Sequence, residues 1–396
     1  MSNPTQGAEM NTSIVVIGGG YAGVLAANRL QAHPGVAVTL VNPRAEFVER
    51  IRLHQLVAGN DDAVAGYDEL LHPSVELVVD TAERIDADTT RVLLASGSAL
   101  HYDYLVYAVG SAAAKPTVPG ADVFAYTLAE YEDARRLRSR LQTLTEMDPI
   151  VVVGAGLTGI ETAAELAEAG HPVTLIGAAL APSLGGGARA DVRSRLLKLG
   201  VRVIEEATVA AVGPHAVQLA VGDDVPAAMT VWTAGFTVPQ LAADSGLACD
   251  ELGRLLTDET LTSCDSDRIV GAGDAVAPSA APLRMSCQAA MPLAAQAAAT
   301  VLARLDGTVP ADLDQAFTGQ CVSLGRRAGV VQLSHPDDSP RRVSVGGRPG
   351  AAIKELVCKG TLWFLRREAR KPGSYMWLKG DHEVRANREL ASAGAL

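Results

Sequence analysis

Two stretches of the chain share one pattern of apolar, glycine and polar positions. Each begins with a short run, residues 14–17 and 150–153, that is apolar throughout and rich in β-branched side chains. Such a run predicts a strand buried on both faces of a parallel sheet. A glycine turn of the form G-x-G-x-x-G, a helical apolar pattern and a second apolar run, at 37–41 or 172–176, follow in each case. The repeat of strand, turn, helix and strand predicts two similar α/β units.

The two glycine turns have the spacing that a dinucleotide pyrophosphate requires. The first glycine permits a tight bend, the second lets the backbone approach the pyrophosphate, and the third lets the helix pack closely on the strand. The amides of the helix N-terminus then hold the phosphates. The positions concerned are Gly18, Gly20, Tyr21, Ala22 and Gly23 in the first unit, and Gly154, Gly156 and Gly159 in the second. One such turn also arises for steric reasons alone, but its repetition in the same context favours two dinucleotide sites.

Polar positions near the first unit are candidates for holding its cofactor. The end of the strand at 37–41 is where an acid usually binds the adenosine ribose, and Asn42 stands there, still able to hydrogen-bond a hydroxyl. The charged segment 43–59 includes Arg50, for which a solvated helix face is the alternative. A later apolar run from 269 leads into Gly273 and Asp274. That carboxylate is expected to bind a sugar hydroxyl, with a simple helix cap as the alternative.

Composition narrows the class of protein. The 396 residues exceed one ordinary core, and 48% hydrophobic with 20% charged residues describes a well-packed protein of two or three domains. A net charge of −11 argues against general nucleic-acid binding. The five cysteines form no C-x-x-C pair, so no zinc ribbon, other metal site or disulfide framework is expected. Together with the absence of an apolar signal or spanning segment, this predicts a cytoplasmic protein.

Four landmarks in chain order make the sequence resemble a known superfamily. They are the first glycine turn at 18–23, the segment 102–110 that ends at Gly110, the second glycine turn at 154–159, and the Gly-x-Gly-Asp element at 271–274. Together they resemble the two-dinucleotide-domain flavoproteins of the pyridine nucleotide–disulfide oxidoreductase superfamily. The resemblance implies two Rossmann-like domains, with FAD on a discontinuous first domain and NAD(P)H on an inserted second one. The implied bounds are 11–115 and 262–325 for the FAD-binding domain, 116–261 for the NAD(P)H-binding domain and 326–396 for a C-terminal region.

Within this superfamily, the absence of paired cysteines after the first helix argues against a disulfide reductase. The segments 230–236, which includes Gly235, and 317–327 are similar to type II NADH dehydrogenases and apoptosis-inducing-factor-like oxidoreductases. The resemblance implies an enzyme that takes hydride from NAD(P)H and passes electrons to an acceptor, with a quinone as the leading expectation. The alternatives are a flavin reductase or oxidase acting on a small molecule or redox partner, and an apoptosis-inducing-factor-like NAD(P)H sensor with slow turnover.

The same resemblance implies roles for single side chains. Glu161 directly follows the second turn, and the resemblance implies that it lies near the nicotinamide and flavin, where it transfers protons or orients the nicotinamide ring. The alternative is that its negative charge only interacts favourably with the N-terminus of its helix. Gln288 is kept from the family's acceptor pocket, and Met291 stands where a second glutamine would lie, so both are assigned to the acceptor site. Gly177, ending the strand at 172–176, offers neither an acid nor a base to the adenosine ribose. It predicts weak discrimination between NADH and NADPH, within about tenfold.

The C-terminal segment differs in charge from the rest of the chain. Residues 341–388 hold 12 Lys and Arg against 4 Asp and Glu, a charge of +8, so the remainder sums to −19. Ile353, Leu356, Val357 and Gly360 have the spacing of one helical face, and Lys354 lies among several basic residues nearby. This combination is typical of a helix that lies on an anionic membrane surface, here the cytoplasmic one. The alternatives are a cover for the flavin domain or a homodimer interface.

Overall fold

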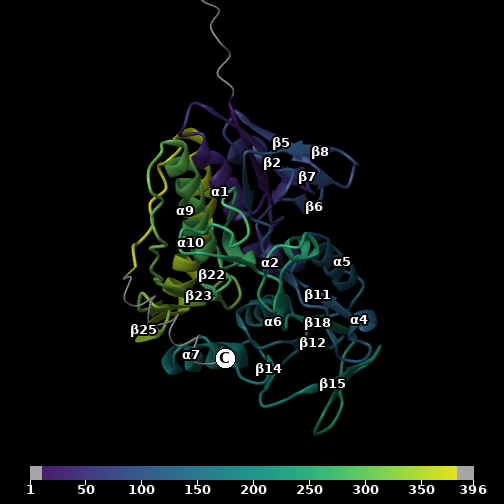
Figure 1. Ribbon diagram of the computed structural model, residues 1–396. Coiled ribbons are helices and arrows are strands. Elements are labelled where there is room, and N and C mark those ends of the chain that lie inside the picture. The colour runs from purple at the N-terminus through teal and green to yellow at the C-terminus, as the bar shows by residue number, and fades with distance from the viewer. Residues whose placement is uncertain (1–10, 381–396) are drawn as a thin grey trace, which may run out of the picture.

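The computed structural model describes residues 11–380 and consists of two α/β units joined by a third region (Figure 1). The first unit lies at the top of the view and the second at the bottom. Along one side run helices α1 (Tyr21–Leu30), α9 (Cys287–Leu305) and α10 (Gly347–Arg370). Each unit is built on a parallel five-stranded sheet. The predicted α/β fold with two Rossmann-like units is therefore confirmed.

The first sheet has the strand order β21-β9-β1-β2-β5, all parallel. Its strands are β1 (Thr12–Ile17), β2 (Val36–Asn42), β5 (Val75–Val79), β9 (Tyr104–Tyr107) and β21 (Ile269–Gly271). Ile14 and Val16 of the central strand are fully buried, which explains why that run is apolar throughout. An antiparallel meander of β6 (Ala82–Asp86), β7 (Arg91–Leu94) and β8 (Ala99–His101) follows β5.

The second sheet repeats this arrangement in the order β11-β18-β12-β13-β14, again parallel. Its strands are β11 (Ala125–Thr127), β12 (Ile150–Val153), β13 (Val173–Ile176), β14 (Arg202–Ile204) and β18 (Met229–Trp232). The accompanying helices are α4 (Ala121–Phe124), α5 (Tyr131–Leu141), α6 (Leu157–Glu168) and α7 (Gly186–Lys198). A small antiparallel sheet of β15 (Val209–Val212), β16 (Ala216–Leu219) and β17 (Val225–Pro226) is attached to it.

The chain enters and leaves the second unit at one place. There β10 (Ala112–Ala113) pairs antiparallel with β19 (Phe236–Thr237). Immediately afterwards Val238, and Leu241 of α8 (Leu241–Asp244), pack into the core of the first unit. We therefore propose that the return to the first domain begins near residue 238 and not at 262, because the apolar side chains after β19 are buried in the first core.

The C-terminal region connects the two units. It consists of an antiparallel sheet of β23 (Gly319–Ser323), β24 (Gly329–Ser334) and β25 (Pro340–Gly346), followed by α10. Val322 and Val330 belong to the core of the second unit, whereas Leu365 and Tyr375 belong to that of the first. Residues 381–388 of the predicted basic segment lie outside the described part of the chain.

Short elements complete the first unit. They are β3 (Glu46–Val48), η1 (Arg50–Arg52), α2 (Leu53–Ala58), β4 (Val64–Gly66), α3 (Tyr67–Leu70), β20 (Leu255–Thr257), η2 (Gly273–Ala275) and β22 (Val276–Pro278). Of these, α2 packs on α5 and α6, so it brings residues of the first unit into contact with the second unit. Within residues 11–380, no helix combines the length and apolarity needed to cross a bilayer.

Candidate functional site

The first glycine turn is shaped by close backbone contacts. Gly18 has φ +102°, and a Cβ there would lie 2.3 Å from the carbonyl oxygen of Ala108. A Cβ on Gly23 would lie 1.7 Å from the carbonyl oxygen of Gly18. Gly20 differs, because a Cβ on it would have open space around it. The turn is therefore packed against protein at its first and third glycines and left open at the second, where a pyrophosphate approaches in such folds.

The second glycine turn has the same geometry. Gly154 has φ +112°, and a Cβ there would lie 2.6 Å from the hydroxyl of Thr233. A Cβ on Gly159 would lie 1.8 Å from the carbonyl oxygen of Gly154, while Gly156 again faces open space. Two turns, 136 positions apart from Gly18 to Gly154, thus provide two matching cradles. Both fit a dinucleotide.

Helices α1 and α6 begin at these open glycines. Gly20 and Gly156 are their N-caps, neither start has a side-chain cap, and neither helix has an acid in its first turn. The first amides of each helix therefore have no partner from a cap, and the positive end of the helix dipole adds to the attraction for phosphate. The absence of a side-chain cap and of a first-turn acid is the sequence feature that allows each helix N-terminus to bind an anion.

Asn42 supports the first turn from the neighbouring strand. Its Oδ1 accepts a hydrogen bond from the amide of Gly19 at 3.0 Å, and its Nδ2 donates to the carbonyl of Arg44 at 2.8 Å. On the other side, the hydroxyl of Tyr67 donates to the carbonyl of Gly19 at 2.7 Å. Asn42 thus positions the turn, and its role toward a ribose stays a prediction. Tyr67 was not identified from the sequence, because nothing local connects it to the turn.

A polar chain joins Arg50 to Asp274. Arg50 Nη1 donates to the carbonyl of Ser111 at 2.6 Å, and the Ser111 hydroxyl donates to Asp274 Oδ2 at 2.7 Å. Asp274 Oδ1 accepts from the amide of Ser286 at 3.1 Å. Asp274 lies within η2 and contacts groups from two other segments, so it does more than cap its own helix. Sequence reasoning missed Ser111, although it directly follows Gly110.

The other predicted cofactor residues lie in the same neighbourhoods. Gly110 has φ +72°, and a Cβ on it would lie 3.8 Å from Arg50. Gly273 has φ +80° and packs on Ala22, since a Cβ there would lie 3.1 Å from the Ala22 methyl. Tyr21 is buried edge-on against Phe47 with ring centroids 5.1 Å apart. Gly235, with φ +86°, lies beside the β10–β19 crossing.

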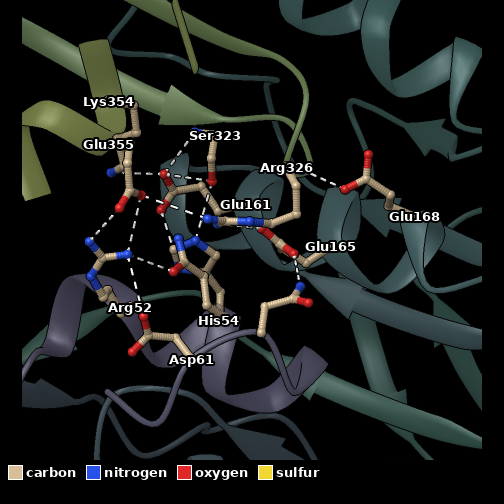
Figure 2. Close-up of polar contacts among 12 residues, drawn as sticks. Arg52, His54, Asp61, Glu161, Glu165, Glu168, Ser323, Arg326, Lys354 and Glu355 are labelled. Atoms are coloured by element: carbon tan, nitrogen blue, oxygen red, sulfur yellow. Dashed lines mark hydrogen bonds and ion pairs between the residues drawn. The ribbon is translucent and has the colours of Figure 1, made fainter. Parts of the chain in front are cut away.

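Glu161 of α6 is the centre of a buried charged cluster (Figure 2). Lys354 Nζ of α10 lies 3.0 Å from Glu161 Oε1, and the amide of Ser323 donates to the same oxygen at 2.9 Å. His54 Nδ1 of α2 lies 3.7 Å from Glu161 Oε2, and His54 Nε2 is 3.2 Å from the Ser323 hydroxyl. The carboxylate therefore faces three other elements and does not complement the N-terminus of its own helix.

Burial and the charges within the cluster determine the protonation states of Glu161, Lys354 and His54. Burial alone would raise the pKa of Glu161, but the Lys354 ammonium holds it below its usual value. Burial alone would lower the pKa of Lys354, but the Glu161 carboxylate raises it. Burial lowers the pKa of His54 to about 4, despite the opposing effect of Glu161. At neutral pH the cluster is an ion pair of Glu161 and Lys354 beside an uncharged imidazole.

Three cysteine thiols lie close enough to Lys354 to interact with its charge. Burial raises the pKa of Cys287 to about 11 and that of Cys358 to about 12, and it also raises the pKa of Cys321. All three are free cysteines. Since a thiolate is the reactive form, these groups are unreactive thiols at neutral pH.

A cleft of about 290 Å³ reaches the cluster from outside. Ser323 and Lys354 lie on its wall, so it leads to two of the residues that hold Glu161. The rest of the lining is Gln55, Gly325, Arg326, Arg327, Arg348, Ala351, Ala352 and Glu355. Around the cluster, Arg52 binds Glu355 at 3.1 Å, which ties the first unit to α10 (Figure 2).

The predicted acceptor residues lie on α9. Met291 is buried in the core of the first unit, and the side-chain amide of Gln288 contacts the Thr318 hydroxyl. Neither residue lines the cleft beside Lys354. Sequence reasoning missed Lys354 as a site residue and assigned it to a membrane surface. That assignment is wrong, because the ammonium is held inside by Glu161.

Comparison with known proteins agrees with this geometry. The family described as pyridine nucleotide-disulphide oxidoreductase matches residues 12–300, which include both glycine turns. The chain belongs to this family. As a member of the pyridine nucleotide-disulphide oxidoreductases, it uses FAD and NAD(P)H. The open glycines at Gly20 and Gly156 and the uncapped helix starts fit these two dinucleotides.

Individual relatives give a more detailed picture of the family. An NADH dehydrogenase-like protein of Mycobacterium tuberculosis is 34% identical over 293 residues, covering 67% of this chain and 73% of the relative. The demethylphylloquinone reductase of Synechocystis is 28% identical over 297 residues, covering 66% and 71%. In fold, the chain is similar to the sulfide:quinone oxidoreductase of Aquifex aeolicus, with a TM-score of 0.79, 22% identity and coverage of 91% and 93%. The protein is thus an NAD(P)H-dependent flavoprotein oxidoreductase.

Proposed function

We propose that this oxidoreductase delivers the electrons of NAD(P)H, through FAD, to a quinone. The observation that carries the proposal is the Glu161–Lys354 ion pair, at 3.0 Å, in which Lys354 lies on the wall of a cleft. A quinone reductase and an NADH dehydrogenase-like protein among the relatives support it. FAD supplies the redox chemistry, accepting hydride and releasing electrons.

The stoichiometry of quinone reduction explains the need for an ionisable pair. A quinone takes up two electrons and two protons to become a quinol, whereas oxidation of NAD(P)H supplies two electrons and one proton. One further proton therefore comes from solution. Lys354 Nζ carries a proton, Glu161 holds it in place, and the cleft connects the ammonium with the outside. In this proposal Glu161 and Lys354 form the proton-holding site for the acceptor.

Ser323 and His54 complete this site. The Ser323 amide and hydroxyl both donate to Glu161, at 2.9 and 3.3 Å, so they stabilise the carboxylate in its charged form. His54 is uncharged at neutral pH, and its Nε2 lies within hydrogen-bonding distance of the Ser323 hydroxyl. These contacts orient the carboxylate and favour its charged form beside the Lys354 ammonium.

We also propose that the protein binds peripherally to a membrane through α10. The side chains of Ile353, Leu356, Val357 and Trp363, here called the α10 apolar face, are exposed on this helix. Ala352 in the cleft wall and Leu356 are four residues apart, so the cleft and this face adjoin on one side of the helix. A lipid-soluble acceptor would then reach the cleft from the bilayer. The exposed Lys359 and Arg348 add positive charge for anionic head groups.

A panel of acceptors tests the electron-transfer proposal. NADH oxidation is measured at steady state with a menaquinone analogue, with oxygen and with ferricyanide. We expect the highest kcat/KM with the quinone. Fast turnover with the other two but not with the quinone would indicate a reductase or oxidase of small molecules or redox proteins. Slow turnover with all three, with flavin absorbance that stays bleached, would favour an NAD(P)H-sensing flavoprotein.

A further inference from the structure

The second unit has no space for the acid that usually contacts the adenosine ribose. Gly177 directly follows β13, which is the position where such an acid stands in this type of fold. A Cβ on Gly177 would lie 2.7 Å from the Ala155 methyl and 2.9 Å from the Ala155 amide nitrogen. Gly177 alone predicts weak discrimination between NADH and NADPH. In the structure, the end of the neighbouring strand β14 lies beside Gly177.

Strand β14 ends beside Gly177. The amide of Gly177 donates to the carbonyl of Ile204 at 3.0 Å, and the amide of Glu206 donates to the carbonyl of Ala178 at 3.1 Å. Glu205 and Glu206 therefore follow the neighbouring strand at its carboxyl end. In an open parallel sheet the ligand lies outside the carboxyl ends of the strands. The acid that is missing from β13 is thus supplied from β14.

The two acids differ in what they contact. Glu205 Oε1 accepts from the amide of Leu180 at 2.9 Å, and its other oxygen pairs with Arg193. Glu206 is exposed, and within residues 11–380 its carboxylate forms no ion pair or hydrogen bond. It also adopts φ +53°, a left-handed conformation that non-glycine residues rarely hold and that is concentrated at functional sites. Glu206 is therefore the carboxylate available to a ligand.

The nearby basic residues face Glu205, through an ion pair with Arg193 and at longer range from Arg189. Arg193 is neutralised by Glu205, and Arg189 donates to the carbonyl of Leu184 at 3.1 Å. A 2′-phosphate at this strand end would meet the Glu205 and Glu206 carboxylates, with Arg193 and Arg189 on the Glu205 side, whereas a 2′-hydroxyl could donate to the unpaired Glu206 carboxylate.

We propose that Glu206 accepts a hydrogen bond from the adenosine 2′-hydroxyl and makes the protein selective for NADH over NADPH. The proposal rests on NAD(P)H binding by the second unit but not on the identity of the electron acceptor. A 2′-phosphate is disfavoured by repulsion from the Glu206 carboxylate. The expected preference exceeds the tenfold limit that Gly177 alone would give.

Calorimetry on the FAD-loaded protein tests this without turnover. The probes are ADP-ribose and its 2′-phosphorylated form, titrated into the wild type, Glu206→Gln and Glu206→Lys. Glu251→Lys is the matched control, because Glu251 is exposed on a turn of the first unit and has no ion pair within the described residues. FAD content and circular dichroism verify that each variant is folded.

We expect the wild type to bind ADP-ribose more than about tenfold more tightly than the phosphorylated probe. Glu206→Gln should reduce this ratio, Glu206→Lys should reduce it by a further factor of about ten or invert it, and Glu251→Lys should leave it unchanged. Equal affinities in the wild type, or a ratio that neither Glu206 variant changes, would overturn the proposal. A failed quinone assay would not affect this result, so the two proposals are distinguishable.

Discussion

Lys354 Nζ and Glu161 Oε1 lie 3.0 Å apart, and this contact joins helix α10 to the second dinucleotide unit. Both groups are largely removed from solvent, and desolvation alone would favour their neutral forms. A buried ion pair of this kind is weak evidence for a role in stability, because apolar residues of similar volume often pack at equal or lower cost. In the proposed function, this buried and ionised pair holds a proton beside the cleft for the acceptor.

Replacement of Glu161 tests that role. We expect Glu161→Gln to slow electron transfer to the quinone by about 10²-fold, the lower range for loss of an acid–base group, while FAD content stays full. Stopped-flow experiments measure reduction by NADH and reoxidation by the quinone separately, and the second should be the slowed step. Glu165→Gln is the control, because Glu165 is also buried on α6 but pairs with Arg326 and Asn60. Unchanged rates in Glu161→Gln would exclude a catalytic role.

A double-mutant cycle tests the ion pair itself. Glu161→Gln leaves the Lys354 ammonium buried without its partner, and Lys354→Met leaves the carboxylate without its cation. Each single change should lower the free energy of unfolding by about 3 kcal/mol, and the double variant should lose less than the sum. The measurement is chemical denaturation monitored at equilibrium. Additive losses would mean that the two groups are energetically independent.

His54 gives the protein a defined response to acid. Its pKa is lowered to about 4 by burial, whereas in the unfolded chain it is near 6.5. Between these values the unfolded state binds a proton that the native state does not, so stability is lost as pH falls from about 6.5 to 4. The loss amounts to about 3 kcal/mol over that window.

Thermal unfolding as a function of pH measures this effect. We expect Tm to fall across the window in the wild type and to fall less in His54→Asn. His215→Asn, at an exposed turn, should behave like the wild type. The Glu161 carboxylate, with its lowered pKa, adds a further loss that begins as pH falls below about 4.5, the value for an unperturbed glutamate, because the unfolded chain then binds a proton that the native state does not. A Tm profile that His54→Asn does not alter would show that the histidine is not the group responsible.

The sequence predicts the two cradles because their chemistry is local. Gly18 and Gly23 are five positions apart, and the spacing itself encodes the turn and the helix start. The Glu161 cluster is different, because His54, Ser323 and Lys354 come from three distant elements. Lys354 and Lys359 look alike in an amphipathic pattern, and only packing shows that one is buried and the other exposed. Long-range packing thus determines what local periodicity cannot.

The glycine turns yield a prediction that separates binding from folding. A Cβ at Gly20 would meet no protein atom within 4 Å, so Gly20→Val should fold but fill the space for pyrophosphate and lose FAD. Gly18→Ala forces a Cβ to 2.3 Å from the Ala108 carbonyl at φ +102° and should impair folding itself. Gly156→Val should keep FAD and raise the Kd for NADH. FAD content, circular dichroism and NADH titration measure these outcomes, and FAD retention by Gly20→Val would contradict the assignment.

The α10 apolar face predicts membrane binding that point variants can test. Truncation is unsuitable, because α10 also packs Leu365 into the first core. Leu356 and Trp363 are 70% and 52% exposed, so their replacement by glutamate should leave the fold intact. We expect Leu356→Glu/Trp363→Glu to abolish co-sedimentation with anionic liposomes. The equally charged control, Met147→Glu/Val221→Glu, changes exposed apolar residues of the second unit and should bind as the wild type does. The face is a homodimer interface instead if neither the wild type nor the control binds liposomes and if Leu356→Glu/Trp363→Glu lowers the mass measured by light scattering. The mass would fall because carboxylates buried between two copies would separate them.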